Sequence, residues 1–168
     1  SDLTDTVMFD PYSTIMKKQP LISVIVASYN YAKYIKETLD SLIRQTNKSF
    51  EVIVVDDGSK DQSLPIIEEY ANRFKNIKLY THPSNQNRGL AETVILGIEK
   101  SNGEYIAFCE SDDYWTNNHI EYLQDTIQQN PLANFIVNGI KVINLSNNPE
   151  YDSYIEFSSS FLKKHSGS

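Results

Sequence analysis

The chain has 168 residues, of which 40% are hydrophobic and 22% are charged, and its formal net charge is −7. These values are near the average for globular domains and exclude a disordered or fibrous protein, and the length suits one domain with its own core. The acidic balance disfavours nucleic acid as a partner, because phosphate-backbone binding requires clustered Lys and Arg. No apolar run approaches the roughly 20 residues of a membrane-spanning segment, so we expect none in this chain.

The first 20 residues are a polar leader without the basic and apolar stretches of a secretory signal. The chain begins with Ser instead of Met, which leads us to expect a processed protein or a fragment. The single cysteine, Cys109, excludes an internal disulfide and a cysteine zinc site, and its apolar neighbours predict a buried side chain. We therefore expect a cytoplasmic protein, and peripheral attachment to the inner face of a membrane stays open.

Apolar, β-branched strands alternate with amphipathic helices along most of the chain. The strands are apolar on both faces, which is typical of a parallel sheet covered on both sides. The helices carry apolar residues at helical spacing among charged ones. In chain order we predict a strand at 21–28, a helix at 32–45, a strand at 51–55, a helix at 64–74, a strand at 77–80, a loop at 82–89, a helix at 90–100, a strand at 105–109 and a helix from Asn117 or Asn118 to Gln129.

This alternation predicts an α/β fold, with an open, mostly parallel, Rossmann-like sheet, helices on both faces and right-handed crossovers. We assign residues 21–145 to this domain and expect at least one more strand between residues 134 and 145. Residues 146–168 are predicted to be a loose tail, with the start of a truncated acceptor region as the alternative.

Three polar segments follow predicted strands directly, namely Ser28–Asn30, Asp56–Ser59 and Glu110–Asp113. Ligands of parallel α/β sheets bind beyond the carboxyl ends of the strands, so we expect these segments in one crevice. Carboxylates held close together repel one another unless a cation neutralises them, and their oxygens suit Mg²⁺ or Mn²⁺. The sequence therefore predicts a divalent-metal site at Glu110–Asp113. It contains no P-loop and no Gly-x-Gly-x-x-Gly motif, so a glycine-rich phosphate loop is disfavoured.

Several of these residues also have a plainer interpretation. Asp56–Ser59 has the composition of a polar turn, and Glu110–Asp113 that of a solvated loop with a helix-capping acid. For Trp115 we favour packing over a role in the site. His82 and His119 lack a spaced partner, which is more typical of surface or capping residues than of metal ligands.

Four segments, in the same order, resemble the inverting glycosyltransferases of family 2, which have the GT-A fold. The resemblance extends over about residues 21–138, and four segments in order are far more specific than any one. It implies transfer of a sugar from a nucleoside diphosphate sugar, with a UDP-sugar favoured, to a glycan or other hydroxyl acceptor, as in polysaccharide biosynthesis. The four segments are Ile25–Asn30, Val54–Ser59, Asn87–Leu90 and Gly103–Trp115.

The resemblance also implies roles for individual residues. Asp57, together with Asp56, would bond to the base, and Glu110 would face the ribose or the diphosphate. Bound Mn²⁺ or Mg²⁺ would stabilise charge on the leaving nucleoside diphosphate. The residues implied in nucleotide binding are Ala27, Tyr29, Asn30, Asp56, Asp57, Arg88, Gly89, Glu110 and Ser111, and those implied in metal binding are Asp112 and Asp113.

The chain departs from the family pattern at two positions. The first acid of the family's Asp-x-Asp motif is Glu110 here, which moves the carboxylate oxygens by one methylene group. The Arg-Asn pair that the family often carries on its third helix is replaced by Val94–Ile95, and Arg88 is the candidate substitute.

An inverting transfer also requires a general base near the acceptor hydroxyl. The acids toward the end of the chain do not match the family's acceptor-side segment, and we weigh them only as weak candidates. A nucleotide-sugar binding module or truncated fragment without catalysis therefore stays open, as does a nucleotidyltransferase, although the glycine-rich basic loop of that class is missing. The weak candidates are Glu150, Asp152 and Glu156.

Overall fold

The computed structural model describes residues 21–132, 135–137 and 160–163; the predicted leader lies outside them. The predicted alternation up to residue 129 is confirmed, with small shifts at the ends of elements, and the predicted loop contains a short 3-10 helix. In chain order the elements are β1 (Ile22–Ser28), α1 (Ile35–Ile43), β2 (Phe50–Asp56), α2 (Ser63–Arg73), β3 (Ile77–Thr81), η1 (Pro83–Asn85), α3 (Leu90–Lys100), β4 (Tyr105–Phe108), α4 (His119–Gln129), β5 (Phe135–Val137) and β6 (Ser160–Lys163).

The sheet has the strand order β3-β2-β1-β4-β6-β5. Strands β1 to β4 pair in parallel, whereas β6 pairs antiparallel with both β4 and β5. The predicted α/β fold with a mostly parallel sheet is therefore confirmed, and β5 lies where we expect a further strand. Strand β6 lies in the segment predicted as a tail, where we predict no strand; the rest of that segment is outside the described residues.

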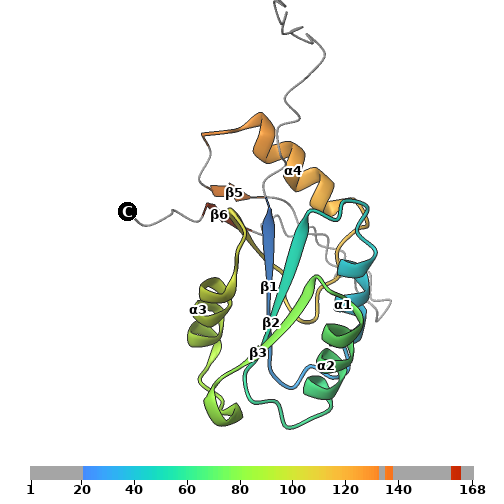
Figure 1. Ribbon diagram of the computed structural model, residues 1–168, viewed down its shortest axis with the longest axis vertical. Helices are drawn as coiled ribbons and strands as arrows, with labels where there is room; N and C mark the ends of the chain where they lie inside the picture. Colours follow the sequence, from blue (N-terminus) through green and yellow to red (C-terminus); the bar gives the residue numbers. More distant parts are fainter. Residues whose placement is uncertain (1–20, 133–134, 138–159, 164–168) are drawn as a thin grey trace, which may run out of the picture.

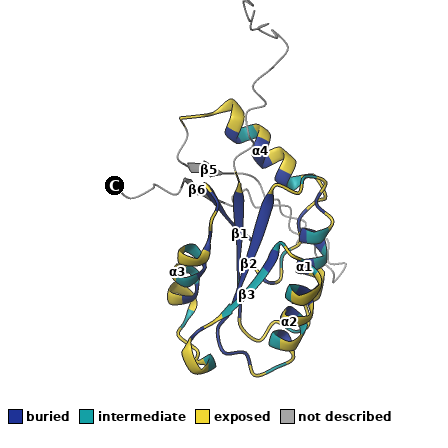
Figure 2. Ribbon diagram, in the orientation of Figure 1, coloured by how far each residue is buried: buried dark blue, intermediate teal, exposed yellow. Residues whose placement is uncertain are grey.

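Helices cover both faces of the sheet, with α1 and α2 on one side and α3 on the other (Figure 1). Val24 and Val26 of β1 pack into the cluster that contains the apolar side chains of α1, α2 and α4. Ile25, between them, points to the opposite cluster, against which Leu96 and Ile98 of α3 pack. Because successive strand residues face opposite sides, a strand covered on both sides needs an unbroken apolar run. Figure 2 shows the result in β1 and β2, which are buried along almost their whole length, beneath helices whose outer faces are exposed.

The sequence predicts that this helix starts at Ala32, but α1 begins at Ile35. The main-chain N–H of Ala32 donates instead to Oδ2 of Asp61, 3.0 Å away in the β2–α2 loop, and Asn30 turns the chain with a φ of 57°. This contact between distant loops extends the linker after β1 and joins it to the linker after β2.

Candidate functional site

The carboxyl ends of β1, β2 and β4 bring the three predicted polar segments to one edge of the sheet. Ser28 is the register partner of Asp56, and the N–H of Asp57 donates to the main-chain oxygen of Ser28 at 2.8 Å. On the other side of β1, the N–H of Cys109 donates to the oxygen of Ile25 at 3.0 Å. The strand order reverses between β1 and β4, and such switch points are the usual ligand sites of α/β sheets.

The linker after β1 contributes Tyr29 and Asn30. The N–H of Asn30 donates to Oγ of Ser59 at 2.9 Å, and its side-chain oxygen accepts from the N–H of Lys60 at 2.7 Å. The Asn30 side chain therefore joins the two loops. Tyr29 is 43% exposed, and Ala27, at the end of the strand, is half-buried, so these two residues present surface to a ligand.

Asp56 closes the turn that follows β2. It is fully buried, and its two carboxylate oxygens accept from the N–H (2.9 Å) and the hydroxyl (2.5 Å) of Ser59. Gly58 adopts a φ of +76°, and a Cβ atom there would lie 2.8 Å from the main-chain oxygen of Asn85 and the nitrogen of Asn87. The plainer interpretation, a polar turn, therefore holds for Asp56, and only glycine fits at position 58 of this turn.

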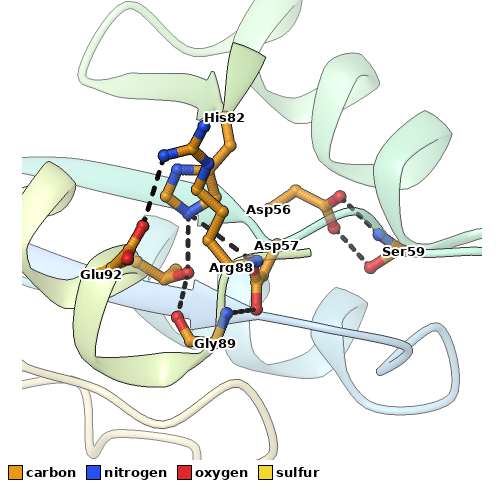
Figure 3. Close-up of polar contacts among 8 residues, drawn as sticks. Asp56, Asp57, Ser59, His82, Arg88, Gly89 and Glu92 are labelled. Atoms are coloured by element: carbon orange, nitrogen blue, oxygen red, sulfur yellow. Dashed lines mark hydrogen bonds and ion pairs between the residues drawn. The ribbon is translucent and has the colours of Figure 1, made fainter. Parts of the chain in front are cut away.

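Asp57 is directed toward the start of α3 (Figure 3). Its side chain is buried; Oδ1 accepts from the N–H of Arg88 at 2.6 Å and Oδ2 accepts from the N–H of Gly89 at 2.9 Å. Nε2 of His82 lies 3.5 Å from Oδ1. The carboxylate therefore fixes the loop before α3 against the end of β2.

His82 is buried, so the prediction of a surface residue is wrong; it does occupy the N-cap position of η1, although its side chain makes no capping hydrogen bond. Its Nε2 lies 2.9 Å from Oγ1 of Thr93, and that hydroxyl donates to the main-chain oxygen of Gly89 at 2.8 Å. Because threonine has a single hydroxyl proton, Nε2 must be the donor to Thr93, which assigns the ring proton to Nε2 in the neutral histidine. No local spacing links His82 to Asp57 and Thr93, so the sequence alone does not reveal this contact.

Arg88 and Gly89 lie immediately before α3. Gly89 has a φ of +88°, and nothing lies within 4 Å of a Cβ atom added there, so the preference for glycine is conformational and not steric. The side chain of Arg88 is 44% exposed and lies 3.5 Å from the carboxylate of Glu92. Exposed ion pairs of this kind contribute little to stability, so the guanidinium of Arg88 can leave Glu92 and bind an anionic ligand at a small cost in free energy.

The acidic segment Glu110–Asp113 follows β4. Glu110 is accessible to solvent, yet partial burial of its carboxyl and the charges of Asp113 and Asp112 raise its pKa. Burial and the charge of Asp112 likewise raise the pKa of Asp113. Ser111 is buried between them. Negative charge is therefore concentrated here, and no Lys or Arg in the described part of the chain forms an ion pair with it.

These carboxylates fit a divalent cation that shares its coordination with a ligand. Within residues 21–132, 135–137 and 160–163, no group of three or more His, Cys, Asp or Glu side chains is arranged to hold a metal ion unaided. Mg²⁺ is commonly held by one or two carboxylates, with waters and substrate phosphates completing the coordination. Asp112 and Asp113 supply hard oxygen donors of the type that Mg²⁺ and Mn²⁺ prefer.

Two neighbours of the acidic segment behave as predicted. Cys109 is 2% exposed, and burial followed by the charge of Asp113 raises the pKa of its thiol, which makes it an inert core residue. Trp115 packs in the core cluster at 8% exposure.

Three polar residues of α1 and its C-terminal end contact this segment, and none of them was predicted from the sequence. Thr38, Ser41 and Gln45 are buried and bond to main-chain atoms of Ser111, Asp113 and the residues that follow them. The signal was present in the sequence. Polar side chains recur at helical spacing beside the apolar stripe of α1, where a helix with one buried face would carry charged residues.

The fold and the site together define an α/β protein of the GT-A class. TarS from S. aureus in complex with UDP is 34% identical, with a TM-score of 0.67 over 76% of this chain and 38% of that one. The mannosyltransferase PcManGT from Pyrobaculum calidifontis, in complex with GDP-Man and Mn²⁺, is 19% identical, with a TM-score of 0.63 over 88% of this chain and 45% of that one, and shows a shared fold alone.

The family model described as Glycosyl transferase family 2 matches residues 23–166, and the chain belongs to this family. The resemblance stated from the sequence is thereby confirmed. An uncharacterized glycosyltransferase of Haemophilus influenzae is 37% identical over 114 residues, which cover 68% of this chain and 45% of that protein. The uncharacterized glycosyltransferase EpsJ of Bacillus subtilis is 39% identical over 113 residues, which cover 67% and 32%. The chain thus spans less than half the length of these relatives.

In the described part of the chain, no helix has the length and apolar character needed to cross a bilayer.

Proposed function

We propose that this chain binds a nucleoside diphosphate sugar, with a UDP-sugar favoured, and that the protein transfers the sugar with inversion to a hydroxyl group of a glycan or other acceptor. The observation that carries the proposal is the concentration of mutually repelling carboxylates at the switch point between β1 and β4. The UDP and UDP-GlcNAc complexes of TarS support a uridine nucleotide.

The nucleotide is proposed to lie across the ends of β1 and β2. Ala27 and Tyr29 offer accessible surface there, and Asn30 holds the neighbouring loops in place. Asp57 is the proposed contact to the base. A carboxylate oxygen has two lone pairs, and its Oδ2 receives only one hydrogen bond within the described part of the chain. Asp56 is proposed to shape the turn, because both its oxygens bond to Ser59.

Glu110 is proposed to face the ribose or the diphosphate, with Arg88 as the nearby cation for the diphosphate. Asp112 and Asp113 are the proposed ligands of Mn²⁺ or Mg²⁺. Such an ion supplies Lewis-acid stabilisation of the charge on the leaving nucleoside diphosphate. The task of the chain is to present these carboxylates on the edge of the sheet that receives the nucleotide.

The second candidate is a nucleotide-sugar binding module that does not catalyse transfer. The acids weighed as general base, Glu150, Asp152 and Glu156, lie outside the described residues. A nucleotidyltransferase is no longer favoured, because the chain belongs to a glycosyl transferase family. We keep the cytoplasm as the proposed location, since one buried cysteine suits a reducing compartment, and attachment to the inner membrane face remains the alternative.

Calorimetric titration with UDP, with and without Mn²⁺, tests the proposal. We expect Mn²⁺ to strengthen UDP binding and Asp112→Ala to weaken the Mn²⁺-dependent binding at least about tenfold. Asp125→Ala, on the exposed face of α4, removes the same charge away from the site and should bind as the parent does. Equal UDP binding without metal and in Asp112→Ala would contradict the proposal. Hydrolysis or transfer assays with UDP- and GDP-sugars then separate an enzyme from a binding module.

A further inference from the structure

Helix α1 has two buried faces of opposite character. Its apolar face, with Ile35, Leu39 and Leu42, belongs to the core cluster beneath the sheet. Its polar face consists of Thr38 and Ser41, to which we add Gln45, two residues after the end of the helix; each of the three is at most 1% exposed. Buried polar side chains are costly unless they are hydrogen-bonded, so the partners of this polar face indicate what it does.

Thr38 contacts the acidic segment on both sides of Asp112. Its hydroxyl lies 2.6 Å from the main-chain oxygen of Asp113 and 3.0 Å from that of Ser111. A hydroxyl has one proton, which is directed to one of these oxygens at a time, and Asp113 offers the shorter contact. The main-chain oxygens of Ser111 and Asp113, one before and one after Asp112, thereby both lie against a single hydroxyl of α1.

Ser41 and Gln45 extend this contact along the chain. Oγ of Ser41 accepts from the N–H of Trp115 at 3.0 Å. The Gln45 side chain donates to the oxygen of Thr116 at 2.7 Å and accepts from the N–H of Ile120 at 2.9 Å. Between β4 and α4 the chain forms neither helix nor strand, so its buried main-chain groups need partners from elsewhere. Thr38, Ser41 and Gln45 provide them for Ser111, Asp113, Trp115 and Thr116.

We propose that Thr38, Ser41 and Gln45 are positioning residues that hold the acidic segment in the geometry required for metal binding. The proposal rests on the proposed function, because it takes Asp112 and Asp113 as the metal ligands. Carboxylates that repel one another move apart unless their backbone is fixed, and Thr38 and Ser41 of α1 hold that backbone. Residues that orient metal ligands in this way commonly contribute 10- to 100-fold to metal affinity.

Two variants of Thr38 test the proposal. Thr38→Val keeps the volume and removes the hydroxyl, whereas Thr38→Ser keeps the hydroxyl. We expect Thr38→Val to accelerate amide hydrogen exchange in residues 111–117 of the metal-free chain by at least about tenfold, without changing exchange in β2 or α2. It should also reduce the gain in UDP affinity that Mn²⁺ provides by roughly 10- to 100-fold, while UDP binding without Mn²⁺ stays at the parent value. Thr38→Ser should restore both quantities.

Ser41→Ala provides an independent perturbation, because it removes the hydroxyl that accepts from the main-chain N–H of Trp115. Trp115 is the only tryptophan of the chain. Its emission should shift to longer wavelength as the segment loosens. The proposal is overturned if Thr38→Val leaves local exchange unchanged, accelerates exchange everywhere equally, or is not rescued by Thr38→Ser. If the parent shows no Mn²⁺-dependent UDP binding, the proposed function fails and with it the metal role assigned to these residues. Local exchange then still decides whether α1 anchors the segment.

Discussion

Asp57 and Asp112 each belong to an Asp-Asp pair, yet the structure predicts opposite results when either is changed to asparagine. The Asp57 carboxylate is buried and accepts hydrogen bonds from two consecutive main-chain N–H groups, those of Arg88 and Gly89. Asp112 is exposed, and its charge raises the pKa values of Glu110 and Asp113. We therefore expect Asp57→Asn to destabilise the metal-free chain and Asp112→Asn to leave it unchanged or slightly more stable.

The magnitude follows from the hydrogen bonds at Asp57. Asparagine has one side-chain oxygen, so in Asp57→Asn one of the two N–H groups faces an amide that can only donate. The lost charge-assisted bond is worth about 1.5 to 3 kcal/mol, and the remaining bond, now neutral, weakens toward about 1 kcal/mol. We expect the free energy of unfolding to fall by about 2 to 4 kcal/mol, a large part of the roughly 5 to 15 kcal/mol typical of a domain.

Urea unfolding at pH 7, followed by circular dichroism and by Trp115 emission, measures both variants against the parent. Asp112→Asn should differ from the parent by less than about 0.5 kcal/mol, as exposed substitutions usually do. Equal losses in the two variants, or an Asp57→Asn variant as stable as the parent, would refute the assignment of Asp57 as the anchor of the loop before α3.

Three further predictions concern the same region. Burial lowers the pKa of His119 from 6.5 to about 4, so the unfolded chain binds this proton more readily. The free energy of unfolding should therefore fall by on the order of 3 kcal/mol as the pH drops from 6.5 to 4, and His119→Gln should reduce that fall in urea titrations. Gly58→Ala combines an unfavourable φ with a Cβ placed 2.8 Å from main-chain atoms, and thermal unfolding should show a loss of about 2 kcal/mol or more. The raised pKa of Glu110 means that its ionisation disfavours the folded, metal-free chain, so the advantage of Glu110→Gln should grow as the pH rises through the carboxyl range, and its absence in pH-dependent urea titrations would contradict the sign.

The sheet could be predicted because the residue types of its strands, mostly apolar and β-branched, indicate their burial directly. In β1 every residue from Ile22 to Val26 is buried. A short, mostly apolar and β-branched run of this kind is typical of a buried strand. The start of α1 could not be predicted in the same way. Asp61, distant in sequence, accepts from the N–H of Ala32 in the linker, and the helix begins only at Ile35. Boundaries set by contacts between loops leave no periodic signal.

The edge of the sheet that holds the site was also predictable, since the carboxyl ends of parallel strands meet there whatever the loops contain. The contacts within the site were not. His82 meets Asp57 and Thr93 only when β3 and α3 are folded against β2, so the spacing of these residues along the chain carries no information about the contacts. A polar residue in a predicted helix, by contrast, is visible in the sequence, and Ser41 and Gln45 show that it can indicate a second buried surface.

The two Asp-Asp pairs finally show why the acidic residues of one edge cannot all serve the same purpose. Asp56 and Asp57 have four side-chain oxygens, each of which accepts at least one hydrogen bond from the protein, so their charge is already distributed over N–H and hydroxyl donors. Asp112 and Asp113 lie within a segment whose main chain is held by α1, and the charge of Asp112 helps to raise the pKa of Asp113. A cation gains most where charge is fixed in place and unneutralised. The metal is therefore expected at the pair after β4, and the pair after β2 is expected to give the nucleotide a rigid boundary.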